Sequence, residues 1–220
     1  MKKKAVCISA SNIIHSGEGS FSYRVSEMIS GVLARDGISC WIVDLRKEHL
    51  TPCNGCGGCY HKKRCQSDDA FNRLYEKMKE ADYLFFVSPH YAPIPAKLCM
   101  LLEKMEQITF LHWWRDETYQ SELFGKLAGI ISHGGGGENA LEGYKAMVND
   151  TIANALATIQ VKVVPFNSKW NTGIALPVRK VTQKDGIFPV QEYDWKKIEE
   201  TIAAYAEVMV LSSKSSYVII

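Results

Sequence analysis

Long hydrophobic runs are absent from this chain of 220 residues. Its longest apolar segments, such as residues 83–87, fall far short of the ~20 residues that a membrane-spanning helix needs. The apolar stretch behind the N-terminal lysines breaks at Ser9, and no small-residue cleavage site follows, so we expect no secretory signal peptide. These absences predict a cytoplasmic protein that has no membrane partner.

Runs of like charge are scarce as well. The formal net charge is +2, and no cluster of Lys or Arg extends beyond Lys2-Lys3-Lys4, which argues against nucleic acid as a partner. The chain also lacks a GxxxxGK[ST] motif, which argues against hydrolysis of nucleoside triphosphates. No convincing catalytic triad is evident. The function is therefore expected to need none of these features.

What the chain does have is a regular alternation of apolar patterns. Hydrophobic residues make up 46% and charged residues 23% of the sequence, the balance of an ordinary globular protein, and the length fits one domain over residues 1–220. Apolar runs typical of buried strands lie at 5–8, 40–43, 83–87, 127–131 and 161–164. Apolar residues at helical spacing lie at 21–33, 71–78, 98–108, 140–158 and 198–209, with Ser67 as the expected cap of the second helix.

This alternation predicts an α/β fold. Each crossover between strands is long enough for a helix, which favours a flavodoxin-like, doubly wound, five-stranded parallel sheet of order 2-1-3-4-5 with helices on both faces. A doubly wound sheet with more strands is the alternative.

Two insertions depart from the alternation, at 110–125 and 167–192. The second contains Asp185-Gly186, which predicts a small β-hairpin excursion near 175–192. Loops this long are usually functional or lie in an interface.

Ligands of doubly wound sheets bind at the carboxyl ends of the strands, and the first loop there is rich in small polar residues. It runs from Ser9 through Ser11 and on to residues 17–22 at the start of the first helix. Backbone N–H groups at a helix N-terminus attract anions, so a phosphomonoester is the expected ligand. The alternative is a polar turn in which Ser20 or Ser22 caps the helix.

The loops after the third and fourth strands are also unusual. Residues 88–95 contain three prolines, which stiffen the backbone where a planar ring could lie against Tyr91. Residues 134–137 are four successive glycines, which we interpret as a place where the backbone closely approaches a ligand. The alternative for residues 88–95 is a rigid connection between the third strand and the following helix. His133 is either a donor to the ligand or a structural histidine.

Four of the seven cysteines lie within thirteen positions, in the loop between the second strand and the second helix. They are Cys53, Cys56, Cys59 and Cys65, in the pattern CxxCxxCx₅C. Glycines between them allow the loop to curl, so that four thiolates could converge on one point. Soft thiolate sites select iron–sulfur clusters or zinc, and compact spacing favours a [4Fe–4S] cluster. Zinc, and free or redox-active thiols without a metal, remain alternatives.

Together these residues resemble the flavodoxin-like NAD(P)H-dependent FMN reductases, and the iron–sulfur flavoproteins in particular. The resemblance rests on the Ser-Ala-Ser of the first loop, on residues 52–59 with Cys65 and Asp68-Asp69, on Ser88-Pro89-His90-Tyr91, and on the glycine loop. It implies FMN as the cofactor and a [4Fe–4S] cluster on the four cysteines. The FMN phosphate would contact Ser9, Ser11, Ser20, Phe21 and Ser22. The isoalloxazine would lie beside Pro89, His90, Tyr91, Ala92, His133, Gly134 and Gly135.

The function expected from this resemblance is transfer of electrons from NAD(P)H, or from a ferredoxin-like carrier, to a quinone, a flavin or a similar acceptor. The alternatives are an electron-transfer module without a small-molecule substrate of its own, and a zinc-stabilised interaction protein. The resemblance further implies a homodimer or homotetramer. We expect Trp113, Trp114 and Trp170 to lie at a subunit interface or over the flavin, because exposed aromatic side chains otherwise promote aggregation.

Overall fold

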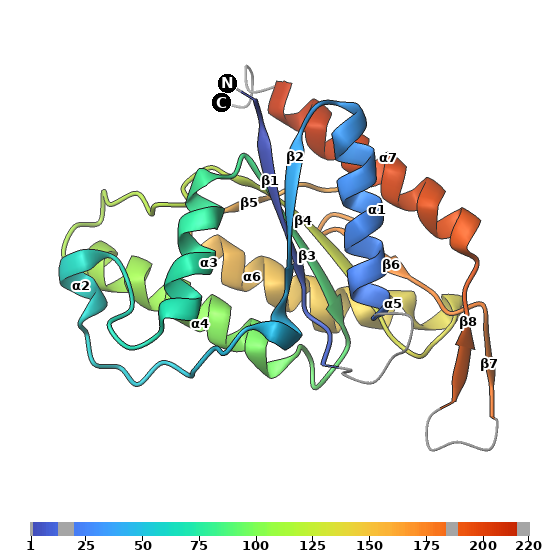
Figure 1. Ribbon diagram of the computed structural model, residues 1–220, viewed down its shortest axis with the longest axis horizontal. Coiled ribbons are helices and arrows are strands. Elements are labelled where there is room, and N and C mark those ends of the chain that lie inside the picture. Colours follow the sequence, from blue (N-terminus) through green and yellow to red (C-terminus); the bar gives the residue numbers. More distant parts are fainter. Residues whose placement is uncertain (1, 13–19, 184–188, 215–220) are drawn as a thin grey trace.

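The structure is a computed structural model that describes residues 2–12, 20–183 and 189–214. Its main sheet is parallel, with the order β2-β1-β3-β4-β5 and a further strand, β6, paired with β4 (Figure 1). The strands are β1 (Lys4–Ser9), β2 (Ser39–Asp44), β3 (Tyr83–Pro89), β4 (Leu127–His133), β5 (Lys162–Val163) and β6 (Ile174–Leu176). The predicted order 2-1-3-4-5 is confirmed.

The fifth strand differs from the prediction because it is divided into two short pieces. β5 pairs only with Leu127 and Ala128 at the start of β4, whereas β6 pairs with the last three residues of β4. Pro165 follows the last hydrogen bond from this edge, which Val164 donates to Ala128, and proline has no N–H group to extend the ladder. The chain therefore leaves the sheet and returns as β6.

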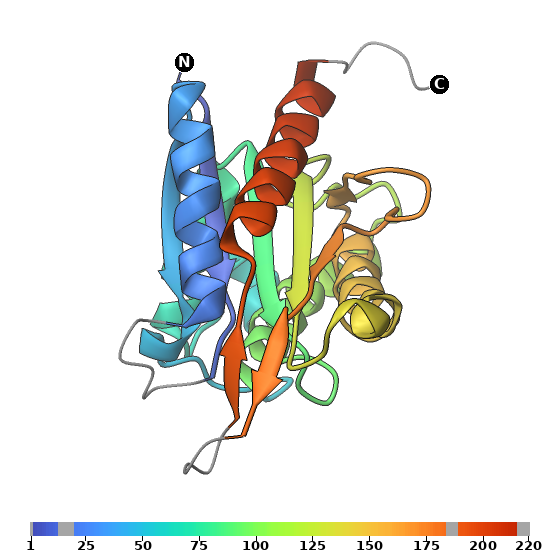
Figure 2. The ribbon, with the colours of Figure 1, turned by 90° about the vertical axis from the view of Figure 1, so that its right-hand side faces the viewer.

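Helices cover both faces of the sheet, and Figure 2 shows α1 and α7 together on one of them. The opposite face is covered by α3, α4 and α6. The helices are α1 (Phe21–Arg35), α2 (Cys59–Lys62), α3 (Asp69–Glu80), α4 (Ala96–Trp113), α5 (Leu141–Tyr144), α6 (Asp150–Thr158) and α7 (Trp195–Lys214), with the short turns η1 (Leu45–Lys47), η2 (Glu138–Ala140) and η3 (Lys145–Asn149). Among the described residues, no helix is long and apolar enough to cross a lipid bilayer.

The central strand β3 shows why the sheet is covered on both sides. All seven of its residues are buried, and successive side chains point to opposite faces. Leu84 and Phe86 join the core beneath α3 and α4, whereas Phe85 and Val87 join the core beneath α1 and α7. Because neither face contacts water, the strand reads as one continuous apolar run.

Several predicted boundaries need correction. Ser67 does not cap α3: the carboxylate of Asp68 accepts the N–H of Phe71 at 2.8 Å, one residue later than expected. α4 continues through Trp113, so the first part of the predicted 110–125 insertion is helical. The predicted helix over 140–158 is interrupted by η3, a π-helical turn.

The predicted hairpin excursion is present in the second insertion. β7 (Lys180–Thr182) and β8 (Val190–Glu192) form an antiparallel pair that stands apart from the main sheet (Figure 1). The expected Asp185-Gly186 turn lies outside the described residues. β6, at the start of the predicted excursion, belongs to the main sheet instead.

Gly173, where the chain re-enters the sheet, provides a test of the divided strand. Its φ is +114°, and a Cβ there would lie 2.1 Å from the carbonyl oxygen of Ile130. We expect Gly173→Ala to lower the free energy of unfolding by at least about 2 kcal/mol, measured by urea denaturation. In the control Gly143→Ala the new methyl meets only Met147 Cε, at 3.7 Å, and should stabilise by up to ~1 kcal/mol. Equal stability of the two variants would contradict the close approach.

Candidate functional site

The loops that follow β1, β3 and β4 surround a cavity of about 550 Å³ at the carboxyl edge of the sheet. The hairpin borders the same cavity, although it comes from the second insertion. The lining residues are Ser11, Phe21, Pro89, His90, Tyr91, His133, Gly134, Gly135, Pro189, Gln191 and Tyr193. The structure thus brings the three predicted loops together and leaves the space between Ser11, Tyr91 and Gly135 open.

Four of the predicted binding residues do not line this cavity. The Ser9 hydroxyl is buried at the end of β1 and has no hydrogen-bond partner among the described residues. Ser20 is the N-cap of α1, and its hydroxyl accepts the N–H of Tyr23 at 3.2 Å, as the alternative interpretation expected. Ser22 is fully buried, and Ala92 lines a neighbouring groove.

His133 connects all three loops. Its Nε2 lies 2.7 Å from the hydroxyl of Ser22 in the first turn of α1, and its ring packs 4.5 Å from that of Phe21. Its carbonyl oxygen accepts the N–H of His90, at 2.9 Å. Burial lowers the pKa of His133 to about 3, so the imidazole is neutral near pH 7. Its present contacts therefore make it a structural histidine that fixes the edge of the cavity.

The glycine loop has a different explanation from the predicted one. A Cβ at Gly134 would lie 2.5 Å from the ring of Tyr144, and one at Gly136 would lie 2.5 Å from Ala140 Cβ. The Tyr144 hydroxyl also accepts the N–H of Gly136, at 2.6 Å. These glycines are therefore required by close packing within the chain itself. Gly135 lines the cavity with less crowding, since a Cβ there would meet a single atom within 4 Å, Gln191 Nε2 at 3.3 Å.

The loop after β3 presents Tyr91 to two spaces. The N–H of Tyr91 donates to the carbonyl of Pro93 at 2.8 Å, which folds the loop back on itself. Tyr91 is 37% exposed and lines both the cavity and an adjoining open groove of about 730 Å³. This groove extends past Met100 to Glu103 along α4. It leads from the cavity towards the cysteine loop, because Glu103 accepts the N–H of Cys53 at 3.1 Å.

The residues from the hairpin were not predicted to form the site. Tyr193 packs 4.4 Å from the ring of Phe21 and donates a hydrogen bond to Gln191. Burial raises the pKa of Tyr193 to about 12, so the phenol keeps its proton. The length of the 167–192 insertion indicated a functional segment. No local pattern identified which of its side chains would turn towards the strands.

The four clustered cysteines line one small cavity of about 20 Å³, at the opposite end of the molecule from the hairpin (Figure 1). All four are free, and Gly55 and Gly57 have φ near +70°, as the curled loop requires. Burial raises the pKa of the Cys59 thiol, and the other three thiols add to the rise. The donor set fits a soft metal or a cluster. However, no three Cys, His, Asp or Glu side chains within the described residues are arranged to hold a metal ion.

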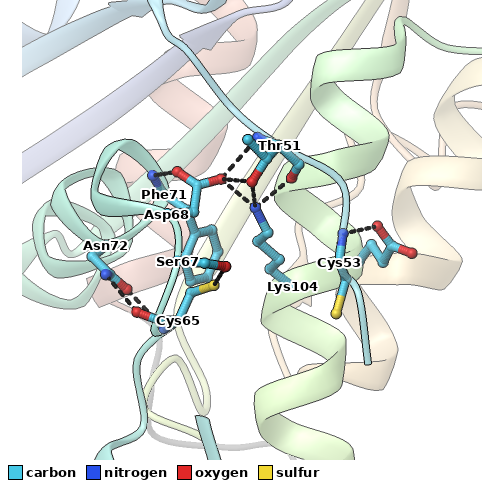
Figure 3. A network of polar contacts seen from close by, with 9 residues as sticks. Thr51, Cys53, Cys65, Ser67, Asp68, Phe71, Asn72 and Lys104 are labelled. Atoms are coloured by element: carbon cyan, nitrogen blue, oxygen red, sulfur yellow. Dashed lines mark hydrogen bonds and ion pairs between the residues drawn. The ribbon is translucent and has the colours of Figure 1, made fainter. Parts of the chain in front are cut away.

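A buried ion pair closes the loop that carries these cysteines (Figure 3). The Lys104 ammonium on α4 bonds to the carboxylate of Asp68 and to the carbonyl and hydroxyl of Thr51. Thr51 stands two residues before the first cysteine of the loop, and Asp68 stands three after the last. Burial opposes ionisation of Asp68, but the bond from Lys104 and the N–H donors around the carboxylate hold its pKa below the usual range. Among the described residues that line the cysteine cavity, Lys104 is the only charged one.

The first and last cysteines of the loop are held through their backbones. Besides the bond from Cys53 to Glu103, the N–H of Cys65 donates to Asn72 Oδ1 and its carbonyl accepts from Asn72 Nδ2, both at 2.8 Å (Figure 3). These bonds do not use the thiols, although Cys65 Sγ lies 3.6 Å from the Ser67 hydroxyl (Figure 3). α3 and α4 therefore position the loop without using the atoms that would bind a metal.

The tryptophans lie apart from the cavity described above. Trp113 and Trp114, 41% and 71% exposed, end α4, which runs from the carboxyl edge of the sheet back to the start of β4. Trp170 lines a separate cavity. None of the three lines the cavity described above, and their place at a subunit interface or over the flavin stays a prediction.

Comparison with known proteins gives a consistent result. The sequence model of the family described as NADPH-dependent FMN reductase matches residues 4–171. Over 126 residues the chain is 28% identical to an iron-sulfur flavoprotein of Methanocaldococcus jannaschii. The alignment covers 57% of this chain and 62% of the relative.

Solved structures show the same fold at low sequence identity. RosB, with bound 8-demethyl-8-formylriboflavin-5'-phosphate, aligns with a TM-score of 0.61 at 18% identity, over 98% of this chain and 82% of RosB. The NAD(P)H:quinone oxidoreductase of Methanothermobacter marburgensis aligns with a TM-score of 0.57 at 18% identity, over 94% of this chain and 96% of that protein.

Removing the buried cation tests how the cysteine loop is held. Lys104→Met leaves the Asp68 carboxylate buried without its partner, so we expect the free energy of unfolding to fall by about 3–5 kcal/mol. Alkylation of Cys53 and Cys65, followed by mass spectrometry, should become faster. The matched control is Lys97→Met on the same helix, since Lys97 donates only to the carbonyls of Leu45 and Arg46, at 2.9 and 3.0 Å. That loss should cost no more than about 1.5 kcal/mol and leave alkylation unchanged. Similar losses in both variants would contradict the special role of Lys104.

The neutral state of His133 predicts a dependence of stability on pH. Its pKa is about 3 when folded and about 6.5 when unfolded, so below about pH 6.5 the unfolded chain binds the extra proton. Stability should therefore fall as the pH falls, by about 2 kcal/mol between about pH 7 and pH 5 from this residue alone. His133→Gln should lose that part of the pH dependence in urea titrations, whereas His49→Gln, at an exposed position, should retain it. Identical pH profiles for the two variants would show that His133 is not the source.

Proposed function

The chain belongs to the NADPH-dependent FMN reductase family, and from that premise we propose that it is an FMN-dependent oxidoreductase. It would transfer electrons from NAD(P)H or a reduced carrier to a quinone, a flavin or a similar acceptor. The observation that carries the proposal is the cavity at the carboxyl edge, where three loops and the hairpin meet around open space. The curated relative is matched over only 62% of its length, so its activity serves here only as support.

The FMN phosphate would lie at the N-terminus of α1, where the helix offers unpaired N–H groups and a positive dipole end. Phe21 and Ser22 supply backbone donors of the first turn, and Ser20 fixes that turn by capping it. Ser11 lines the cavity directly, and the buried Ser9 hydroxyl is a donor still without a partner among the described residues. The Ser22 side chain is engaged by His133, so its contribution would be through the backbone.

The isoalloxazine would lie between the other two loops. Pro89, His90 and Tyr91 would border it on one side, with Ala92 beyond them, and His133, Gly134 and Gly135 would border it on the other. The chemistry that bound FMN supplies is acceptance of a hydride and release of its electrons to an acceptor. The chain contributes rigid walls, exclusion of water and backbone polar groups. The phenol of Tyr193, with its raised pKa, adds no charge to that space.

The groove beside Tyr91 is the place where NAD(P)H or the electron acceptor would dock. It is open, it shares Tyr91 with the cavity, and it is lined by apolar side chains such as Ile94 and Met100. A planar ring in this groove would meet the exposed edge of the flavin site. The same groove ends at Glu103, next to the cysteine loop, so it would also allow an electron carrier to reach both sites.

The cysteines would hold a [4Fe–4S] cluster. Cys53, Cys56, Cys59 and Cys65 face one cavity, their thiols make no ion pair there, and the curated relative is named an iron-sulfur flavoprotein. The thiols would have to rearrange around such a group, because no three of them in the described residues are arranged to hold a metal ion. Zinc, or redox-active thiols without a metal, would use the same donors. If the cluster forms, a ferredoxin-like carrier becomes a fitting electron donor.

Two alternatives keep specific support. An electron-transfer module without its own small-molecule substrate would use the same flavin and cysteine sites, and a zinc-stabilised interaction protein would use the cysteine loop alone. We also propose that the chain forms a homodimer or homotetramer. Phe110, Trp113, Trp114 and Phe124 are exposed, and the rings of Phe110 and Trp114 lie 6.0 Å apart; exposed aromatic side chains of this kind are covered at subunit interfaces.

The spectrum of anaerobically purified protein tests the proposal. We expect flavin absorption bands, a broad iron–sulfur shoulder, and bleaching of the flavin on addition of NADPH. Flavin bands without bleaching would favour the electron-transfer module. A colourless preparation that contains zinc would leave only the interaction protein.

Filling the cavity provides the matched test of where FMN binds. Gly135→Val places a side chain into the open space and should weaken FMN binding by about 10-fold or more, measured by quenching of flavin fluorescence. In Gly31→Val on α1, no atom lies within 4 Å of the new Cβ, so FMN affinity should not change. Unchanged FMN affinity in the Gly135 variant would place the flavin elsewhere.

A further inference from the structure

A second cavity of about 380 Å³ lies on the other side of the glycine loop and shares no lining residue with the flavin cavity. Most of its lining residues come from β6, the start of the hairpin and the first turns of α7. The family match ends at residue 171, whereas most of the lining residues lie between 174 and 201. This cavity is therefore built mainly by a part of the chain that the family match does not include.

Two aromatic side chains, Phe166 and Trp170, line this second cavity. The Phe166 ring meets that of Tyr205 edge to face, with 5.8 Å between centroids, and Tyr205 is itself buried. The Trp170 backbone is held by Asn167 Oδ1, which accepts its N–H at 2.9 Å, and by the N–H of Phe166. Leu141 and Ile198 add aliphatic side chains to the lining, so the cavity is a largely apolar slot. Such a slot suits a planar aromatic ring.

Charged residues line the second cavity, and they differ in whether an ion pair neutralises them. Glu138 is paired with Lys197, at 2.7 Å. Asp194 accepts the N–H of Lys197 at 3.2 Å, at the start of α7. Arg179 has no ion pair among the residues that the structure describes, although its backbone is fixed by the bond to the carbonyl of Glu192. A guanidinium at the edge of an apolar slot is the group that binds a carboxylate through two parallel hydrogen bonds.

We propose that this second cavity is a binding site for a compact aromatic carboxylate, distinct from the flavin site. The ring would lie in the slot between Trp170 and Ile198, and the carboxylate would bind Arg179. The volume falls within the usual range for small-molecule sites. The site is close to the flavin cavity because both border the glycine loop, and Gly136 between them is fastened by Tyr144 on one side and Val178 on the other.

The test is isothermal titration of FMN-loaded protein with 1-naphthoate. Loading with FMN leaves the second cavity open, since the two cavities have no lining residue in common. We expect one molecule bound per chain with Kd below about 1 mM, and FMN retained. 1-Naphthamide, which has the ring without the charge, should bind about 10-fold more weakly because it loses the charged hydrogen bonds.

Variants locate the ligand. Arg179→Gln should weaken 1-naphthoate binding about 10-fold, and Thr201→Phe, which fills the slot from α7, should abolish it. Lys180→Gln removes the neighbouring cation, which does not line the second cavity, and should leave the affinity unchanged. The proposal is overturned if 1-naphthoate fails to bind, if the amide binds equally well, or if the Arg179 and Lys180 variants behave alike. Release of FMN by 1-naphthoate would place the ligand in the flavin cavity instead.

Discussion

The bond between Ser22 and His133 is the contact on which the geometry of the carboxyl edge depends. It joins the first turn of α1 to the last residue of β4, and the two residues are 111 positions apart in sequence. The same histidine accepts from His90 through its carbonyl, so one residue sets the distances between the loops proposed for the phosphate and for the ring. Because the side chain is fully buried, its hydrogen bond is made in a region of low dielectric, where losing it would leave a polar group uncompensated.

The glycine loop shows how packing and binding can be confused in a sequence. Four successive glycines suggested that the backbone approaches a ligand, yet two of them are needed because the Tyr144 ring and Ala140 occupy the space that a side chain would take. The two explanations act together at this loop. The hydrogen bond from Gly136 to Tyr144 holds the backbone of the loop at the edge of the cavity. The neighbouring residue, Gly135, lines that cavity.

The sequence was sufficient for the fold and for most of the site because both follow from local periodicity. Buried strands on a two-sided sheet read as apolar runs, and the loops after them reach the same edge whatever their detailed conformation. The division of the fifth strand was not predictable in this way, since it depends on Pro165 and on contact of Gly173 with Ile130, a residue distant in sequence. Gln191 and Tyr193 could not be predicted as cavity residues for the same reason. Their position is fixed by the packing of Tyr193 against Phe21, which no local pattern encodes.

The two ends of the molecule differ in how charge is placed in buried space. At the cavity proposed for FMN, neutral groups with shifted pKa values, His133 and Tyr193, keep charge away from a space lined by aromatic rings. At the cysteine loop a charge is buried. The Lys104 side chain is only 3% exposed, and its ammonium is bound by the Asp68 carboxylate and the two Thr51 oxygens. A buried ion pair is seldom more stable than apolar residues of the same volume. Its presence is better explained by its position, since it ties Thr51, before the first cysteine, to Asp68, after the last one, and so closes the cysteine loop.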